Sequence, residues 1–193
     1  MAKPRRRSNE ERREQSTETV LQSALELFVG NGYIATSIDD IARRAGLTKG
    51  AVYFYFKDKS SLMLELLEQS AQLYADIFQQ MQLSEKSATE QLEMFVAWSA
   101  RIGAENKELL LLPILISLEF HGREERIEAA VGKMYQRYHD EMQRVYTQGL
   151  RDGEFQLNLP VREQAAVLVA FTDGMLLEWY RWADKLDGRA LAN

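Results

Sequence analysis

The sequence predicts an all-α protein in which an N-terminal three-helix helix-turn-helix domain precedes a larger C-terminal helical bundle. Good helix formers dominate the 193 residues, and only three residues are proline. Apolar residues recur at three- and four-residue steps along most of the chain, which is the period of an amphipathic helix. The one alternating segment, "FQLNL", is too short and isolated to indicate a sheet. The content of 46% hydrophobic and 27% charged residues is typical of a folded chain.

Charge divides the chain in the same way. We expect a flexible basic arm over residues 1–15, the helix-turn-helix domain over 16–60 and the bundle over 61–193. Residues 1–60 contain 11 Lys/Arg and 8 Asp/Glu, whereas residues 61–193 contain 13 and 21. A basic head on an acidic body is the polarity expected of a DNA-binding regulator, although the net charge of the whole chain is −5.

The arm itself has two interpretations. Its basic residues are Arg5, Arg6 and Arg7, followed by Arg12 and Arg13. Such an arm can enter the minor groove of DNA or add nonspecific, salt-dependent attraction. It can equally be a solvated tail without a specific role. The sequence leaves both possibilities open.

The first two helices have recognisable ends. The first is expected to begin near Thr17 and to stop at the glycines of "GNG", residues 30–32. The second is expected to begin at Ser37, which can form a capping box with Asp40, and to end at Gly46. Two short helices joined by a tight turn that contains a glycine form a helix-turn-helix.

The third helix of the motif would be capped by Thr48 and would turn Val52 and Phe56 inward. In a helix-turn-helix this element presents its first residues to the major groove of DNA. Gly50 lets the backbone approach closely, and Lys49 can reach base edges or phosphates. Four further candidates for phosphate contacts are Ser37, Tyr53, Tyr55 and Lys59.

The stretch "GYIATSIDDIARRAGLTKGAVYFYFKDKSSL" resembles the DNA-binding signature of the TetR family of bacterial transcriptional regulators. The resemblance covers about residues 17–65, and Tyr55 stands where the family often has a histidine. It implies an all-helical homodimer that binds an inverted-repeat operator in double-stranded DNA and responds to a small-molecule effector. The commoner role in the family is repression, and an activator is the alternative. By this resemblance the DNA contacts are Ser37, Thr48, Lys49, Gly50, Tyr53, Tyr55 and Lys59.

Beyond Asp58 the chain is expected to be helical throughout. A long helix is predicted over residues 59–82. After a polar break, further helices are predicted near residues 88–104, 107–120, 123–152 and 161–184. Pro113 lies inside one of them and would kink it.

The bundle is rich in methionine and aromatic residues, which line ligand pockets between helices but also form ordinary cores. The candidate pocket residues are Met94, Trp98, Phe120, His121, Met134, Tyr138, Phe171 and Met175. The last helix, "AAVLVAFTDGMLLEWY", is apolar around most of its circumference, so part of it is expected to meet a partner subunit in a two-fold dimer. The candidate interface residues are Val145, Leu168, Phe171, Gly174 and Trp179.

Other classes of function find little support. The chain has no cysteine, no glycine-rich phosphate loop and no histidine pair at metal-binding spacing, so we expect no catalytic residue, metal or cofactor. The apolar runs are too short to span a membrane and no secretory signal is visible, so a cytoplasmic location is expected. A helical protein-interaction module would explain the aromatic residues and the acidic body. It would not explain Thr-Lys-Gly at the start of a short helix.

Overall fold

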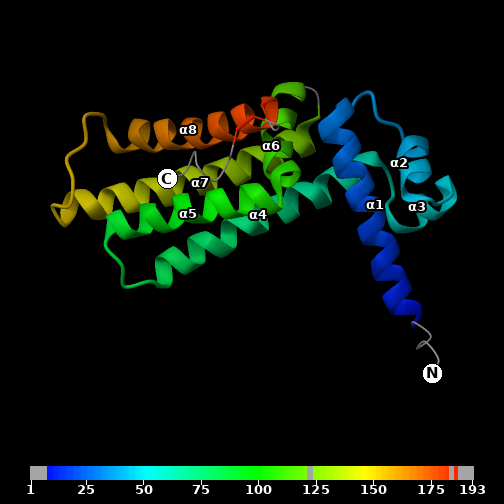
Figure 1. The fold of residues 1–193 in the computed structure, drawn as a ribbon, viewed down its shortest axis with the longest axis horizontal. Coiled ribbons are helices and arrows are strands. Elements are labelled where there is room, and N and C mark those ends of the chain that lie inside the picture. The colour runs from blue at the N-terminus through cyan, green and yellow to red at the C-terminus, as the bar shows by residue number, and fades with distance from the viewer. Residues whose placement is uncertain (1–7, 121–123, 183–184, 187–193) are drawn as a thin grey trace. The chain divides into compact units, whose positions relative to one another are not determined.

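The computed structural model describes residues 8–120, 124–182 and 185–186, and over these ranges the chain is helical without a strand (Figure 1). The prediction of an all-α fold is confirmed, and the predicted bounds from the second helix onward agree to within a few residues. The helices are α1 (Asn9–Asn31), α2 (Ile38–Ala45), α3 (Lys49–Tyr55), α4 (Lys59–Leu83), α5 (Ala88–Glu105), α6 (Lys107–Glu119), α7 (Glu125–Arg151) and α8 (Val161–Arg181).

The chain divides into two compact units, Met1–Leu66 and Leu67–Asn193, which we call the head and the body. The division falls inside α4, about two turns after its start. The sequence placed the corresponding boundary between residues 60 and 61. The difference arises because the first turns of α4 pack within the head, whereas the sequence criterion used only the start of the helix.

The head is built around a small apolar core. Val20, Ala24 and Phe28 of α1 are buried together with Ile41 of α2 and Val52 of α3. Their spacing along α1 places them on one face of that helix, as the apolar period predicted. Each large side chain in such a core contributes about 1.5–3 kcal/mol relative to leaving it in water.

The ends of the head helices follow local rules. Ser37 and Asp40 form the predicted capping box: the Ser37 hydroxyl accepts from the Asp40 amide at 3.2 Å, and the Asp40 carboxylate accepts from the Ser37 amide at 3.1 Å. Gly46 ends α2 with a φ of +67°, a left-handed conformation that strains any residue with a Cβ. Gly32 ends α1, also with a positive φ, of +84°.

The start of α1 corrects the prediction of a flexible arm over residues 1–15. The helix begins at Asn9, and Ser8 caps it in a capping box with Glu11. The signature of that box, a serine followed three residues later by a glutamate, is present in "SNEE" and outweighs the lack of apolar residues. Arg12 and Arg13 are therefore exposed residues of a helix. Arg5, Arg6 and Arg7 lie outside the described residues.

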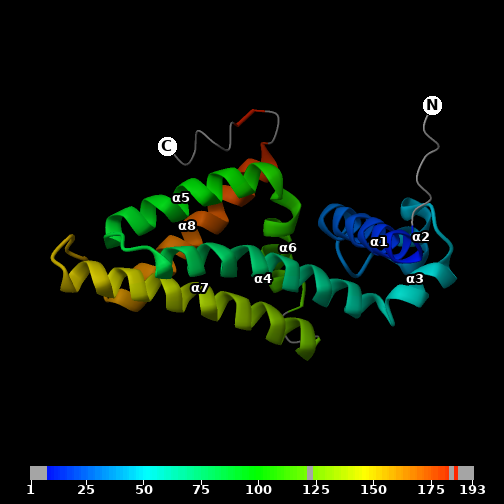
Figure 2. The same cartoon turned by 90° about the horizontal axis from the view of Figure 1, so that it is seen from below.

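The body contains the rest of α4 and helices α5–α8. Helices α4, α5, α7 and α8 run along its length, and the shorter α6 crosses one end (Figures 1 and 2). Its core is largely aromatic: the rings of Tyr74, Phe78, Phe95, Trp98 and Tyr138 pack with centroids 5.2–6.1 Å apart. Tilted and offset rings at such distances gain contact energy beyond simple burial.

The connection between α7 and α8 folds back onto the body. Gly149 of α7 lies under the ring of Phe155, where a Cβ would overlap the ring. The neighbouring Glu154 carboxylate accepts hydrogen bonds from the backbone amides of Ala88 and Thr89, at 2.8 and 2.9 Å. These amides belong to the first turn of α5, so the connection caps a helix 66 residues away.

Helix α6 is buried on most sides, and Pro113 lies inside it. The kink expected at Pro113 stays a prediction. None of the described helices combines the length and the apolar character needed to cross a bilayer.

Candidate functional sites

The turn between α2 and α3 exposes the start of a short helix. After the left-handed Gly46, the Leu47 amide donates to the Ala42 carbonyl at 2.9 Å, which closes α2. The Thr48 hydroxyl then accepts from the Ala51 amide at 3.2 Å and begins α3. Thr48, Lys49 and Gly50 are all exposed. The tight turn therefore leaves the first turn of α3 open to an external partner.

Gly50 has no packing role inside the head. A Cβ built at this position would have only the Thr48 hydroxyl within 4 Å, at 4.0 Å. The backbone there is ordinary right-handed helix, in which glycine costs about 0.5–1 kcal/mol relative to alanine. The protein's own fold thus gives no reason for a glycine, whereas close approach of an external backbone would.

Lys49 is held by an acidic neighbour. Its ammonium donates to the Asp39 carboxylate at 2.8 Å, and this hydrogen bond raises the pKa of Lys49. Both side chains are exposed, so the pair adds little stability and is easily opened. The pair brings the first turn of α3 next to the first turn of α2, which Ser37 caps. The Ser37 hydroxyl is exposed but already bonded to Asp40.

The remaining candidates for DNA contacts are two tyrosines, which differ in exposure, and Lys59, whose ammonium is bonded within the head. Tyr53 is 47% exposed and Tyr55 is partly buried. The Lys59 ammonium donates to the carbonyls of Tyr33 and Thr36, at 2.6 and 2.7 Å, and lies 4.1 Å from the centre of the Tyr33 ring. Lys59 therefore ties the start of α4 to the loop after α1. Sequence reasoning missed this structural role because the partners are more than twenty residues away.

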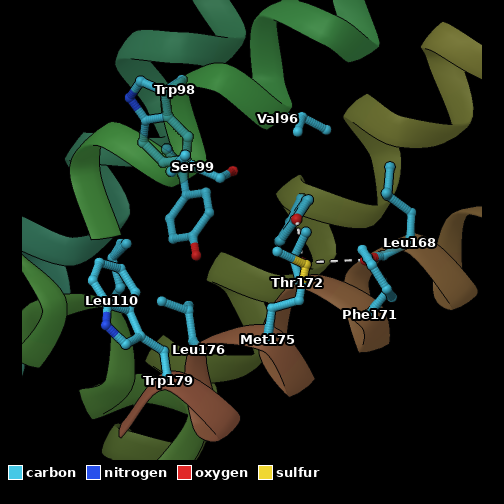
Figure 3. Close-up of a pocket in the computed structure, with 13 residues that line it drawn as sticks. Val96, Trp98, Ser99, Leu110, Leu168, Phe171, Thr172, Met175, Leu176 and Trp179 are labelled. Atoms are coloured by element: carbon cyan, nitrogen blue, oxygen red, sulfur yellow. Dashed lines mark hydrogen bonds between the residues drawn. The ribbon is translucent and has the colours of Figure 1, made fainter. Parts of the chain in front are cut away.

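The body contains a cavity of about 250 Å³. Figure 3 shows Trp98 and Ser99 of α5 on one side of it and Thr172, Met175 and Trp179 of α8 on the other. Every helix of the body contributes to its wall. The lining residues are Tyr74, Val96, Trp98, Ser99, Ala100, Leu110, Tyr138, Leu168, Phe171, Thr172, Met175, Leu176 and Trp179.

The candidate pocket residues fall into three groups. Trp98, Tyr138, Phe171 and Met175 line the cavity. Met94, Phe120 and Met134 do not line this cavity: Met94 packs against the core, Phe120 is buried elsewhere in the body, and Met134 borders a second hollow of about 10 Å³. His121 lies outside the described residues.

Close helix packing shapes the cavity at Trp179. A Cβ built on Gly103 of α5 would lie 2.9 Å from Cζ3 of the Trp179 ring. The absence of a side chain at Gly103 therefore lets the indole of α8 settle against α5. A larger residue there would push the indole aside and change the end of the cavity.

A group of polar side chains lies where α4, α7 and α8 meet. The hydroxyls of Tyr138 and Thr172 are 2.8 Å apart, and the Tyr135 hydroxyl donates to the Asp173 carboxylate at 2.8 Å. Burial raises the pKa of Asp173 to about 6, against the lowering effect of the Tyr135 hydrogen bond. Burial and the nearby Asp173 charge also raise the pKa of Tyr74.

Comparison with known proteins decides the identity. The sequence model of the bacterial regulatory proteins of the tetR family matches residues 20–66. The crystal structure of the MbdR regulator from Azoarcus sp. CIB is 40% identical and matches with a TM-score of 0.85, covering 92% of this chain and 93% of that chain. The chain belongs to the TetR family. It is a transcriptional regulator with a DNA-binding helix-turn-helix domain.

Two more distant relatives match along most of the chain. The fatty acid metabolism regulator protein of Bacillus subtilis (strain 168) is 23% identical over 176 residues, which are 90% of this chain and 88% of that protein. The crystal structure of FadR from Bacillus subtilis in complex with stearoyl-CoA matches with a TM-score of 0.72 at 22% identity. That match covers 91% of this chain and 93% of the FadR chain.

The candidate interface residues of this TetR-family regulator lie in different places. Val145 is fully buried inside the body, so its assignment to a surface was wrong. Leu168 and Trp179 line the cavity. Phe171 also lines the cavity, yet 61% of it is exposed, and nothing lies within 4 Å of a Cβ built on Gly174. The period of α8 alone could not separate its cavity side from its open side, because both are apolar.

Proposed function

We propose that this TetR-family regulator is a repressor that binds an inverted-repeat operator as a homodimer and leaves it when a small apolar effector fills the body cavity. The observation that carries the proposal is the pairing of two features in one chain. One is an exposed, glycine-containing start of α3, and the other is an aromatic cavity in the body. One helix, α4, contributes residues to both units.

In the proposed complex, residues 16–60 provide the DNA contacts. The first turn of α3 enters the major groove, where Gly50 allows close approach and Lys49 leaves Asp39 for a base edge or a phosphate. Tyr53, Tyr55 and the cap hydroxyls of Ser37 and Thr48 contact the phosphate backbone. Lys59 contributes mainly by holding the head in shape, because its ammonium donates to the carbonyls of Tyr33 and Thr36.

Residues 61–193 form the proposed dimerisation and effector-binding part. Helix α8 presents Val167, Ala170, Phe171 and Gly174 at three- and four-residue steps, and these residues are open or exposed. A stripe that includes a half-exposed valine and a largely exposed phenylalanine is typical of an interaction surface. The occupant we propose is the same stripe of a second copy. Such an isologous contact brings two heads to two half-sites.

The effector is expected to be small. Benzene, with six heavy atoms, occupies an engineered cavity of about 150 Å³, so 250 Å³ accepts about ten heavy atoms at that density. The eighteen-carbon chain of the stearoyl group bound by Bacillus subtilis FadR would need about 450 Å³ on the same scale. We therefore propose a compact apolar effector rather than a long fatty-acyl chain.

Release from DNA follows from unequal binding to two arrangements of the chain. An effector that fits the cavity better in one position of α4 shifts the equilibrium toward that position, and the heads then no longer match the half-site spacing. A coupling free energy of about 1–3 kcal/mol lowers operator affinity about 5- to 150-fold.

Operator binding tests the proposal directly. Duplexes selected from a random pool should contain an inverted repeat, and affinity measured by fluorescence anisotropy should fall when a cavity ligand is added. Val167→Glu should convert the dimer to monomers and weaken operator binding, whereas Ala97→Glu, at an exposed site on α5, should change neither. A Val167→Glu protein that stays dimeric, or operator affinity that is constant across every ligand shown to bind, contradicts the proposal.

A further inference from the structure

One hydroxyl at the cavity has no partner within the described residues. Tyr74 lines the cavity, only 7% of the residue is exposed, and no hydrogen bond involves its oxygen. The neighbouring hydroxyls are all used: Tyr138 with Thr172, and Tyr135 with Asp173. Tyr74 is therefore the exception in an otherwise satisfied polar group.

The Tyr74 oxygen is not sealed in the protein. Over the described chain, no buried side-chain nitrogen or oxygen is left without a hydrogen-bond partner. An unpartnered oxygen on a buried residue must therefore reach open space. Tyr74 lines two hollows: the cavity, whose wall includes Trp98 and Tyr138 at 5.2 Å from its ring, and a second hollow of about 10 Å³ beside Met134. The second hollow is too small for any ligand, so the cavity is the space in which a ligand can reach Tyr74.

The other residues of the cavity wall determine the shape and charge of a ligand that can reach the Tyr74 hydroxyl. The lining is mostly flat rings and aliphatic side chains, which favour a flat apolar body. Among the described residues of the wall there is no lysine, arginine or histidine, so a buried anion would find no countercharge from them. The nearby Asp173 carboxylate acts in the same direction, because its charge already disfavours ionisation of Tyr74.

We propose that the Tyr74 hydroxyl is the specificity contact of the cavity, which selects uncharged, single-ring compounds that carry one hydrogen-bonding oxygen. This inference rests on the proposed role of the cavity as the effector site. The oxygen of the ligand forms the hydrogen bond that Tyr74 lacks, and the ring fills the space between Trp98 and Trp179. An isostere without the oxygen leaves Tyr74 unpaired, and a carboxylate leaves a charge unpaired.

Three probes of about the proposed size separate these contributions: acetophenone, ethylbenzene and benzoate. Binding to the full-length protein can be followed at pH 7.5 by NMR, from the indole N–H signals of Trp98 and Trp179. Acetophenone is expected to bind about three- to tenfold more tightly than ethylbenzene and at least tenfold more tightly than benzoate. Tyr74→Phe should remove the advantage over ethylbenzene while leaving ethylbenzene affinity unchanged.

Tyr146→Phe is the matched control, because Tyr146 is a buried tyrosine of α7 that does not line the cavity. It should leave all three affinities unchanged. Equal affinity of the wild-type protein for acetophenone and ethylbenzene, equal loss in both tyrosine variants, or tight binding of benzoate would overturn the inference. So would the failure of all three probes to bind. The role in regulation is tested separately: if acetophenone binds through Tyr74 and the operator complex is unaffected, the proposed release mechanism fails and the specificity contact stands.

Discussion

The head and the body differ in where their candidate functional side chains lie. The head keeps its functional side chains outside, on a turn held by caps and one left-handed glycine, and two ion pairs near α3, Arg43 with Asp40 and Lys49 with Asp39, lie at the surface. The body keeps its candidate ligand-binding side chains around an internal cavity, on five helices whose aromatic residues meet only in the folded state. An exposed site can therefore be encoded in a short stretch of sequence, whereas an internal site depends on packing between distant stretches.

The largest expected effect lies in the head. Gly50→Val places a branched side chain where we propose that DNA approaches, and two copies act on each operator, so affinity should fall at least about 1,000-fold, or about 4 kcal/mol. The head should stay folded, because nothing in it crowds that position. Anisotropy measures the loss, and circular dichroism checks the fold. Near-normal operator binding by Gly50→Val would remove α3 from the DNA interface.

The body should respond to pH through Asp173. Since burial raises its pKa from 3.8 to about 6, the folded state holds a proton that the unfolded state loses, and the stability of the body falls as pH rises from about 4 to 6. Asp173→Asn removes this cost and should stabilise the body by about 2–3 kcal/mol at pH 8 but hardly at pH 4. Urea unfolding followed by tryptophan emission measures both. A stability gain that is the same at pH 4 and pH 8 would contradict the assignment to this carboxyl group.

Two glycines of α7 differ in how tightly their surroundings are packed. Gly149→Ala should destabilise the body by about 1–3 kcal/mol, because the new Cβ would displace Phe155 from its position beside Tyr146. Gly132→Ala, an exposed site on the same helix with open space around it, should stabilise by about 0.5–1 kcal/mol. Thermal unfolding of the two variants gives the comparison. The same sign for both would show that the packing of Phe155 on Gly149 does not matter.

The smallest expected effect concerns the start of α1. If Arg12 and Arg13 bind phosphates from the helix, changing both to alanine should weaken operator binding a few-fold and lower the salt slope by about 1 for each phosphate that an arginine neutralises. Glu14→Gln, on the same exposed turn, should not lower the slope. Anisotropy at several salt concentrations provides the test. An unchanged slope in the double variant would assign these arginines to the solvated surface.

Sequence reasoning reached different depths in the two units. The roles of Ser37, Gly46 and Thr48 could be predicted because each depends on partners within five residues, where capping rules operate. The role of Lys59 could not be predicted, because its carbonyl partners lie in the loop before α2, more than twenty residues earlier in the chain. The same local rule, applied to Ser8 and Glu11, would also have extended α1 to its true start.

In the body, the helices and most of the core could be predicted from apolar period, but the cavity could not. Met134 and Tyr138 lie one turn apart on α7, yet only Tyr138 reaches the cavity. The sequence did not indicate a role for Tyr74 in the cavity, since a tyrosine on the apolar side of α4 is typical of an ordinary core residue. Its importance rests on the lack of a hydrogen-bond partner for its hydroxyl among the described residues, which only the packed structure reveals.

The cap that Glu154 provides for α5 has a consequence for how the chain acquires its structure. The hydrogen bond closes a loop of 66 residues, whereas the caps of the head close loops of three. Closing a long loop costs more entropy than closing a short one. We therefore expect the Glu154 hydrogen bond to form later in folding than the caps of the head. We expect pulse-labelled hydrogen exchange to show α2 protected before the first turn of α5, and the reverse order would refute this. Because the N-terminus leaves the ribosome first, the head, which contains the helix-turn-helix, would thus fold before the body, which contains the cavity.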